Sequence, residues 1–197
     1  QLFKIRPADS ESYDMFGKSV SISGETMLVG NHTDDDLGHF VGSAYVFERV
    51  GSEWIEWQKL LPGDPYPEQF FGQSVSIDGD LLVVGARGDH EDGPFAGAAY
   101  VFARQNGTWS QIAKLLPGDG SAYASFGLSV SISGGRVLVG GWPSTSPGAA
   151  YLFERSGTSW IEIEKLVASD GAVGDAFGSS VALKDDLAVV GAKGAHD

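Results

Sequence analysis

The residues of this sequence best suited to chemistry are acidic side chains and histidines that gather in two short clusters. One is the Asp-Asp-Asp run at positions 34–36, and the other is the His-Glu-Asp run at positions 90–92. Carboxylate and imidazole groups bind divalent cations, so both runs are candidate metal sites. The candidate ligands are Asp34, Asp36, His90 and Asp92. The alternative is a solvated, turn-rich surface in which aspartate only forms turns.

Catalytic chemistry is not indicated by the sequence. The 197 residues include no cysteine, and they contain no Gly-x-Ser-x-Gly elbow, phosphate-binding loop or His-Glu-x-x-His motif. We therefore expect a protein that is not an enzyme. A non-catalytic segment of a larger enzyme is an alternative.

Two further patterns point to contacts with other molecules. Arg87-Gly88-Asp89 is the tripeptide that integrins recognise. The equivalent residues of a later repeat, Lys193-Gly194, instead favour a loop that simply prefers a basic residue before glycine. Trp142 lies in a short loop and is a candidate exposed aromatic contact.

Both asparagines of the sequence, Asn31 and Asn106, begin Asn-x-Thr sequons. They are candidate glycosylation sites, which would favour a secreted protein. Asn106-Gly107 is also a turn signal for a β-hairpin.

The elements that must position these residues come from a repeat. Phe-Gly occurs at positions 16–17, 71–72, 126–127 and 177–178, each time followed by an alternating Ser/Val strand and an apolar run that ends in glycine. In the first three copies a strand of the Ala-Tyr-Val-Phe type follows, and then a strand that begins at tryptophan. In every copy the glycine that ends the second strand follows the Phe-Gly glycine at the same spacing. The loop between the second and third strands varies in length. A fixed frame with variable loops is typical of a scaffold.

This pattern resembles the FG-GAP repeat, which builds the seven-bladed β-propeller of integrin α chains and of many bacterial and algal surface proteins. Gly85-Ala86 and Gly191-Ala192 fit the second half of the motif, whereas Gly30-Asn31 and Gly140-Gly141 depart from it. The resemblance implies an all-β protein, a β-propeller of four-stranded blades. An immunoglobulin-like sandwich is the less regular alternative.

The phase of the repeat predicts three complete blades and two partial ones. Residues 1–7 would form the last strand of a preceding blade, residues 16–62, 71–117 and 126–168 the complete blades, and residues 177–197 a partial blade. An apolar blade edge should not stay in water. We therefore expect the chain to be part of a larger ring, with the missing strand supplied by the rest of the chain or by another subunit.

Charge predicts where a partner binds. The formal net charge is −13, and more than half of the acidic residues lie in loops after the second and fourth strands, which share one face in an up-and-down blade. This balance disfavours nucleic acid and anionic membranes, and no apolar run reaches the ~20 residues of a membrane helix. We expect a protein or glycan partner, with a basic one favoured. The predicted contact residues are Asp34, Asp35, Asp36, His39, Arg87, Asp89, His90, Glu91, Asp92 and Trp142.

Many FG-GAP repeats bind calcium in an Asp-x-Asp-x-Asp-Gly loop between the first two strands. Here that connection is a tight turn such as Asp78-Gly79-Asp80, which cannot supply six to eight oxygen ligands. No cofactor is therefore expected, although calcium stays open. The resemblance implies a secreted or cell-surface scaffold for adhesion or assembly, with a lectin-like carbohydrate-binding module as the alternative.

Overall fold

The computed structural model describes residues 3–143 and 145–195, and all regular elements in these residues are strands. They form three four-stranded antiparallel sheets and one two-stranded sheet. No helix in this part of the chain could span a membrane. The strands are β1 (Ser19–Ser23), β2 (Thr26–Asn31), β3 (Ser43–Val50) and β4 (Glu53–Leu60); β5 (Phe71–Asp78), β6 (Leu81–Ala86), β7 (Ala98–Gln105) and β8 (Thr108–Leu115); β9 (Ser129–Ser133), β10 (Arg136–Gly141), β11 (Ala149–Ser156) and β12 (Ser159–Leu166); β13 (Phe177–Lys184) and β14 (Leu187–Ala192).

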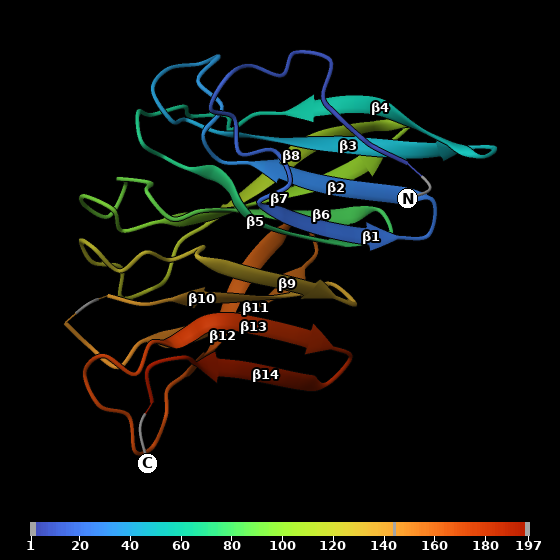
Figure 1. Ribbon diagram of the computed structural model, residues 1–197. Helices are drawn as coiled ribbons and strands as arrows, with labels where there is room; N and C mark the ends of the chain where they lie inside the picture. Colours follow the sequence, from blue (N-terminus) through green and yellow to red (C-terminus); the bar gives the residue numbers. More distant parts are fainter. Residues whose placement is uncertain (1–2, 144, 196–197) are drawn as a thin grey trace.

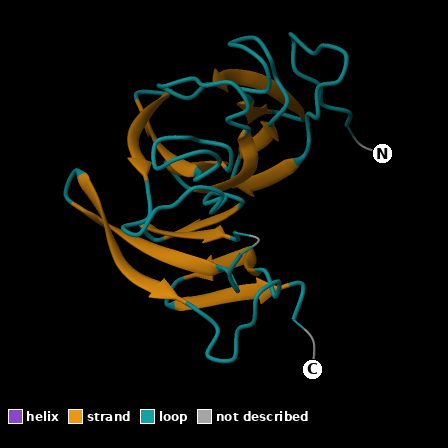
Figure 2. Cartoon of the chain, turned by 90° about the vertical axis from the view of Figure 1, so that its left-hand side faces the viewer, coloured by secondary structure: helices purple, strands orange, loops and turns teal. Residues whose placement is uncertain are grey.

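The sheets follow one another as blades along an open arc (Figure 1, Figure 2). Within each sheet the strands pair in sequence order, and the innermost strands β1, β5, β9 and β13 lie side by side. This is an incomplete β-propeller, which confirms the predicted all-β fold. Residues 3–7 form no strand, but they lie against the outer edge of the first blade, where the Ala8 N–H donates to Glu56 Oε2 at 2.8 Å.

The Phe-Gly motif joins each blade to the one before it. Gly72 has a φ of +89°, and a Cβ there would lie 2.1 Å from the carbonyl oxygen of Ser43. A Cβ on Gly30 would lie equally close to the carbonyl oxygen of Gly72, which accepts a hydrogen bond from Ser19 Oγ at 3.0 Å. Only glycine permits so close a backbone approach. The serine of the predicted Ser/Val strand therefore contributes a blade-to-blade hydrogen bond.

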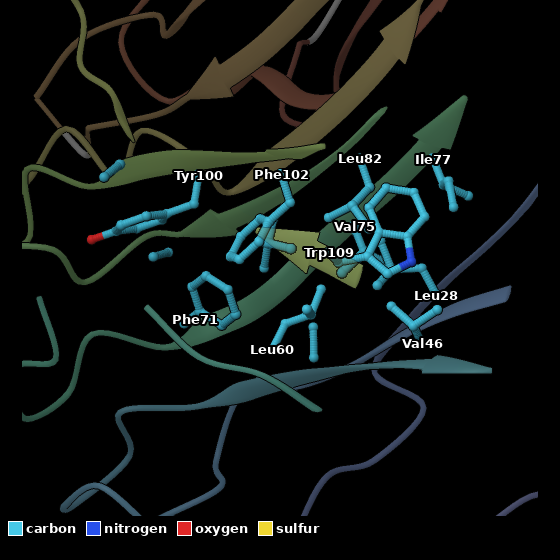
Figure 3. Close-up of a cluster of buried hydrophobic side chains, with 14 residues drawn as sticks. Leu28, Val46, Leu60, Phe71, Val75, Ile77, Leu82, Tyr100, Phe102 and Trp109 are labelled. Carbon is cyan, nitrogen blue, oxygen red and sulfur yellow. The ribbon is translucent and has the colours of Figure 1, made fainter. Parts of the chain in front are cut away.

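The core fills the space between neighbouring blades (Figure 3). The buried Phe71 ring packs edge-on against Tyr100 and Phe102, with centroid distances of 5.4 and 6.1 Å. The same cluster includes Leu28 and Leu60 from the first blade. The long apolar runs of the second and third strands are therefore buried on both faces.

The outer strands also hold neighbouring blades together. Trp109 is buried, and its backbone exchanges two hydrogen bonds with the Gln58 side chain of the preceding blade. Trp57 is half exposed, yet its Nε1 donates to the Gly107 carbonyl oxygen at 2.7 Å. These two tryptophans of the outer strands thus both contact the neighbouring blade.

The inner-strand residues at the beginning of the arc are more exposed than their counterparts in its middle. Val20 and Ile22 of β1 are 66% and 61% exposed, whereas Val75 and Ile77 of β5 are 8% and 6% exposed. On the last sheet, Leu187 of β14 is 74% exposed. That another part of the protein or a second subunit covers these side chains stays a prediction.

We expect Gly127→Ala to destabilise the protein far more than Gly134→Ala. Both residues have positive φ, so both substitutions cost about 1 kcal/mol in backbone strain. A Cβ at position 127 would also meet the Ala98 carbonyl oxygen at 2.1 Å, whereas nothing lies within 4 Å at position 134. Urea unfolding should show an added loss of about 2 kcal/mol or more for Gly127→Ala. Equal losses for the two variants would show that the close approach is not needed.

Candidate functional site

The two ends of the blades differ in the length of their connections. Two-residue turns join β1 to β2 and β3 to β4, and the same holds in the second and third blades. The connections at the other end are long: residues 32–42, 61–70, 87–97, 116–128 and 167–176. We call the surface formed by these connections, together with residues 8–18, 142–143, 145–148 and 193–195, the loop face (left in Figure 1, facing the viewer in Figure 2). Long loops on a rigid frame are where binding contacts concentrate.

Two of the predicted contact residues are buried beneath this face. Asp34 is 4% exposed and Asp89 is 3% exposed. Lys114 Nζ, at the end of the outer strand, lies 3.0 Å from Asp89 Oδ2, 2.5 Å from Asp64 Oδ2 and 2.8 Å from Glu91 Oε2. Asp89 therefore belongs to an ion cluster, and the prediction that it contacts a partner is corrected.

Hydrogen bonds complete the second-blade cluster. The Tyr100 hydroxyl lies 2.8 Å from both Asp89 Oδ2 and Asp64 Oδ1, and Gln69 Nε2 donates to Asp89 Oδ2 at 2.8 Å. Gln69 is fully buried. A buried carboxylate with this many donors is well satisfied, so the cluster stabilises the base of the loops.

The first blade repeats the cluster, and the third blade keeps only part of it. Lys59 Nζ lies 2.8 Å from Asp9 Oδ2 and from Asp34 Oδ2, and 2.6 Å from Asp36 Oδ2. In the third blade, Lys165 pairs with Asp119 alone among the described residues. Sequence reasoning considered only the residues of the loops themselves, and these three lysines of the outer strands must be added to the loop face.

Hydrogen bonds and ion pairs favour the charged forms of the buried aspartate and the lysine in both clusters. Burial alone would raise the pKa of Asp89, but hydrogen bonds from Gln69, the Glu91 N–H and Lys114 outweigh it and hold the pKa below 3.8. Burial alone would lower the pKa of Lys114, but its bonds with Asp64, Glu91 and Asp89 raise it above 10.5. In the first blade, hydrogen bonds likewise outweigh burial: they lower the pKa of Asp34 and raise the pKa of Lys59.

The four candidate metal ligands do not form a metal site. The Lys59 ammonium lies among the carboxylates of Asp34 and Asp36, where a cation would bind. His90 packs against the Tyr66 ring at 4.4 Å, and Asp92 is exposed. Within residues 3–143 and 145–195, no group of three or more His, Asp or Glu side chains has an arrangement that could hold a metal ion.

Two sequence motifs have other roles in the fold. Asn31 is fully buried and donates from Nδ2 to Asp34 Oδ2 at 3.5 Å, so a glycan cannot be carried there in the folded protein. Asn106 is exposed at the β7–β8 turn and keeps its candidacy. Arg87-Gly88-Asp89 is not a displayed recognition tripeptide, because Asp89 is buried against Lys114.

The remaining predicted contacts lie at the surface to different extents. Asp35, Asp36, His39, Glu91 and Asp92 are exposed, whereas Arg87 and Trp142 are half-buried. Lys193 Nζ lies 4.5 Å from the centroid of the Trp142 ring, and the Arg87 guanidinium lies 4.4 Å from that of Phe70. Arg87, Trp142 and Lys193 follow the strand-ending glycine by two residues in successive blades, and they share a cavity of about 440 Å³ with Phe95 and Tyr123.

Sequence reasoning missed the apolar side chains that the loop face exposes. Tyr13 is 93% exposed, Tyr123 is 60% exposed, and Met15, Leu37 and Tyr66 are each about half exposed. Tyr13 and Tyr123 occupy the same position of the repeat, and both have positive φ. This shared position in the repeat is the sequence signal that could have identified them as exposed residues. Exposed aromatic residues on one face are candidates for contacts with another molecule.

Comparison with known proteins agrees with the geometry of the blades. A family model described as FG-GAP repeat matches residues 1–47, 54–102, 109–153 and 160–197. No curated protein matches the sequence. Among solved structures, Sqt1 of Saccharomyces cerevisiae is similar over 81% of this chain, with a TM-score of 0.49 and 11% identity, and the chain spans 38% of that structure's chain.

We expect Lys114→Met to destabilise the protein by about 3 kcal/mol, because it leaves the buried Asp89 carboxylate without its cation. Lys165→Met, at the equivalent position of the third blade, should cost less than about 1 kcal/mol, since Asp119 is half exposed. Denaturant unfolding of both variants measures the difference. Similar losses would contradict a special role for the buried aspartate.

The stabilisation by Asp89 should be lost in acid. Because its pKa in the folded protein lies below the ordinary 3.8, the contribution is present above about pH 4 and disappears as the pH falls through the folded pKa. The free energy of unfolding of Asp89→Asn should be about 1–3 kcal/mol lower than that of the wild type at pH 7. This difference should shrink below pH 4. Asp80→Asn, in an exposed turn, is the control and should show no such convergence.

Proposed function

The chain belongs to the FG-GAP repeat family, and on this basis we propose that it is a non-catalytic scaffold whose loop face binds other proteins in adhesion or assembly. We further propose that it acts in a secreted or cell-surface protein. The repeat type supports this location, as does the sequon at the exposed Asn106.

The observation that carries the proposal is the gathering of exposed aromatic residues on the loop face. Tyr13, Tyr66 and Tyr123 stand on loops whose bases are held by the lysine clusters and by the Phe-Gly contacts. Tyrosine offers a large contact area and loses little conformational freedom on binding. A rigid frame that displays such residues is preorganised for a partner.

Charge favours a basic partner surface. After the clustered carboxylates are paired with lysine, Asp35 and Asp92 are exposed and make no ion pair with any described residue. Long-range attraction between these acids and a basic surface would speed association and orient the partner.

Carbohydrate binding is the second candidate, and one observation favours it. Trp142, Tyr123 and Phe95 line the cavity of about 440 Å³ on the loop face, and aromatic walls of this kind can stack on sugar rings.

The test is to select a random peptide library against the purified protein. We expect the enriched peptides to be basic and to contain aromatic residues, and their affinity to fall steeply from low to high salt. The double variant Asp35→Lys/Asp92→Lys should weaken binding at least about tenfold, which corresponds to about 1.4 kcal/mol.

The matched control is Asp80→Lys/Asp185→Lys, at exposed turns of the opposite end, which should leave affinity unchanged. Equal effects of both double variants would overturn the loop-face assignment. Binding of neutral glycans that Trp142→Ala abolishes would instead establish the carbohydrate candidate.

A further inference from the structure

The third blade keeps the lysine and the tyrosine of the ion cluster but lacks most of its carboxylates. Lys59 and Lys114 each contact three carboxylates, whereas Lys165 contacts only Asp119 among the described residues. The cause lies in the sequence. The loop that carries Asp89 and Glu91 in the second blade spans residues 87–97, but its counterpart in the third blade spans only residues 142–148.

A cavity of about 360 Å³ lies in this part of the third blade. Ala124 lines it and occupies the repeat position of Gln69, the side chain that donates to Asp89 in the second blade. The Gln69 and Glu91 side chains of the second blade thus have no equivalent in the third blade. The lining combines polar groups with an apolar wall, and includes Asp119, Ser146, Tyr151, Lys165, Pro147 and Val167.

We propose that this cavity, the blade-3 pocket, binds a small organic monocarboxylate whose oxygens contact Lys165 Nζ and the Tyr151 hydroxyl. The second blade supplies the reference geometry. There the Asp89 carboxylate lies 3.0 Å from the lysine Nζ and 2.8 Å from the tyrosine hydroxyl oxygen. A ligand carboxylate in the same place gives Lys165 a second anionic partner through a charge-assisted hydrogen bond.

The rest of the pocket restricts the ligand. Pro147, Val167 and Ala168 offer an apolar wall for a short hydrocarbon or sugar body, and the volume lies in the range of small-molecule sites. The Asp119 carboxylate beside Lys165 disfavours a second negative charge. The pocket should therefore prefer a monocarboxylate to phosphate.

Thermal unfolding of the purified protein tests the proposal with acetate, glucuronate and neutral glucose, against sodium chloride and phosphate at matched ionic strength. We expect a saturable rise in Tm with both carboxylates and none with glucose, chloride or phosphate. A larger rise in Tm with glucuronate than with acetate would identify an acidic sugar as the source of the carboxylate. Equal rises with the two would identify a free small acid. Lys165→Met should reduce the affinity at least about tenfold, whereas Lys114→Met, in the complete cluster, should leave it unchanged.

A second variant keeps the test decisive if Lys165→Met unfolds. In the second blade, Gln69 Nε2 lies 2.7 Å from the Tyr100 hydroxyl, so Ala124→Glu should place a built-in carboxylate beside Tyr151. This variant should melt at a higher temperature without ligand and lose the response to carboxylates. The proposal is overturned if neither acid produces a saturable shift beyond that of chloride, or if Ala124→Glu leaves the response intact.

Discussion

The whole arrangement depends on the close approach of each Phe-Gly backbone to the second strand of the blade before it. The Gly72 carbonyl oxygen lies 2.1 Å from the point where a side chain on Gly30 would begin, and Ser19 donates to that oxygen. A larger residue at either glycine would force the two blades apart. Leu28 and Leu60 of the first blade can share one buried cluster with Phe71 only at this separation, and the loops keep their common face only while the blades keep their angle.

The sequence was sufficient for the fold because the signals that specify it are local and repeated. Phe-Gly, the Ser/Val alternation and the apolar runs each report on a single strand, and four copies remove the ambiguity of one. The expected tight turn at Asp78-Gly79-Asp80 lies between β5 and β6, as the hairpin pattern requires. Residues 1–7 were predicted by phase alone to be the last strand of a preceding blade, and residues 3–7 form no strand.

The site was less predictable because burial of its acids depends on partners that are distant in the sequence. In the sequence, Asp89 has the character of a loop-tip contact. In the fold, Lys114 at the end of the outer strand and Tyr100 on the neighbouring strand both contact its carboxylate. A charged residue in a loop is ordinarily solvated, and only a paired one can be buried. The repeat did contain a signal, since a lysine and a tyrosine recur at fixed positions in all three complete blades, with an aspartate in the two that have the longer loop.

The difference between the second and third blades shows how a repeat can diverge without losing its fold. The strands, the Phe-Gly contact and the Lys-Tyr pair are common to both, so the frame tolerates a loop four residues shorter. Shortening the loop removes two carboxylates together with their desolvation cost, and it leaves Lys165 40% exposed where Lys114 is 16% exposed. A partly solvated lysine is stable with one carboxylate, whereas a buried one is not. Loss of the internal anion therefore leaves a cavity lined by Lys165 and its single partner Asp119 on an unchanged scaffold, which is the physical condition for a structural cluster to become a binding site.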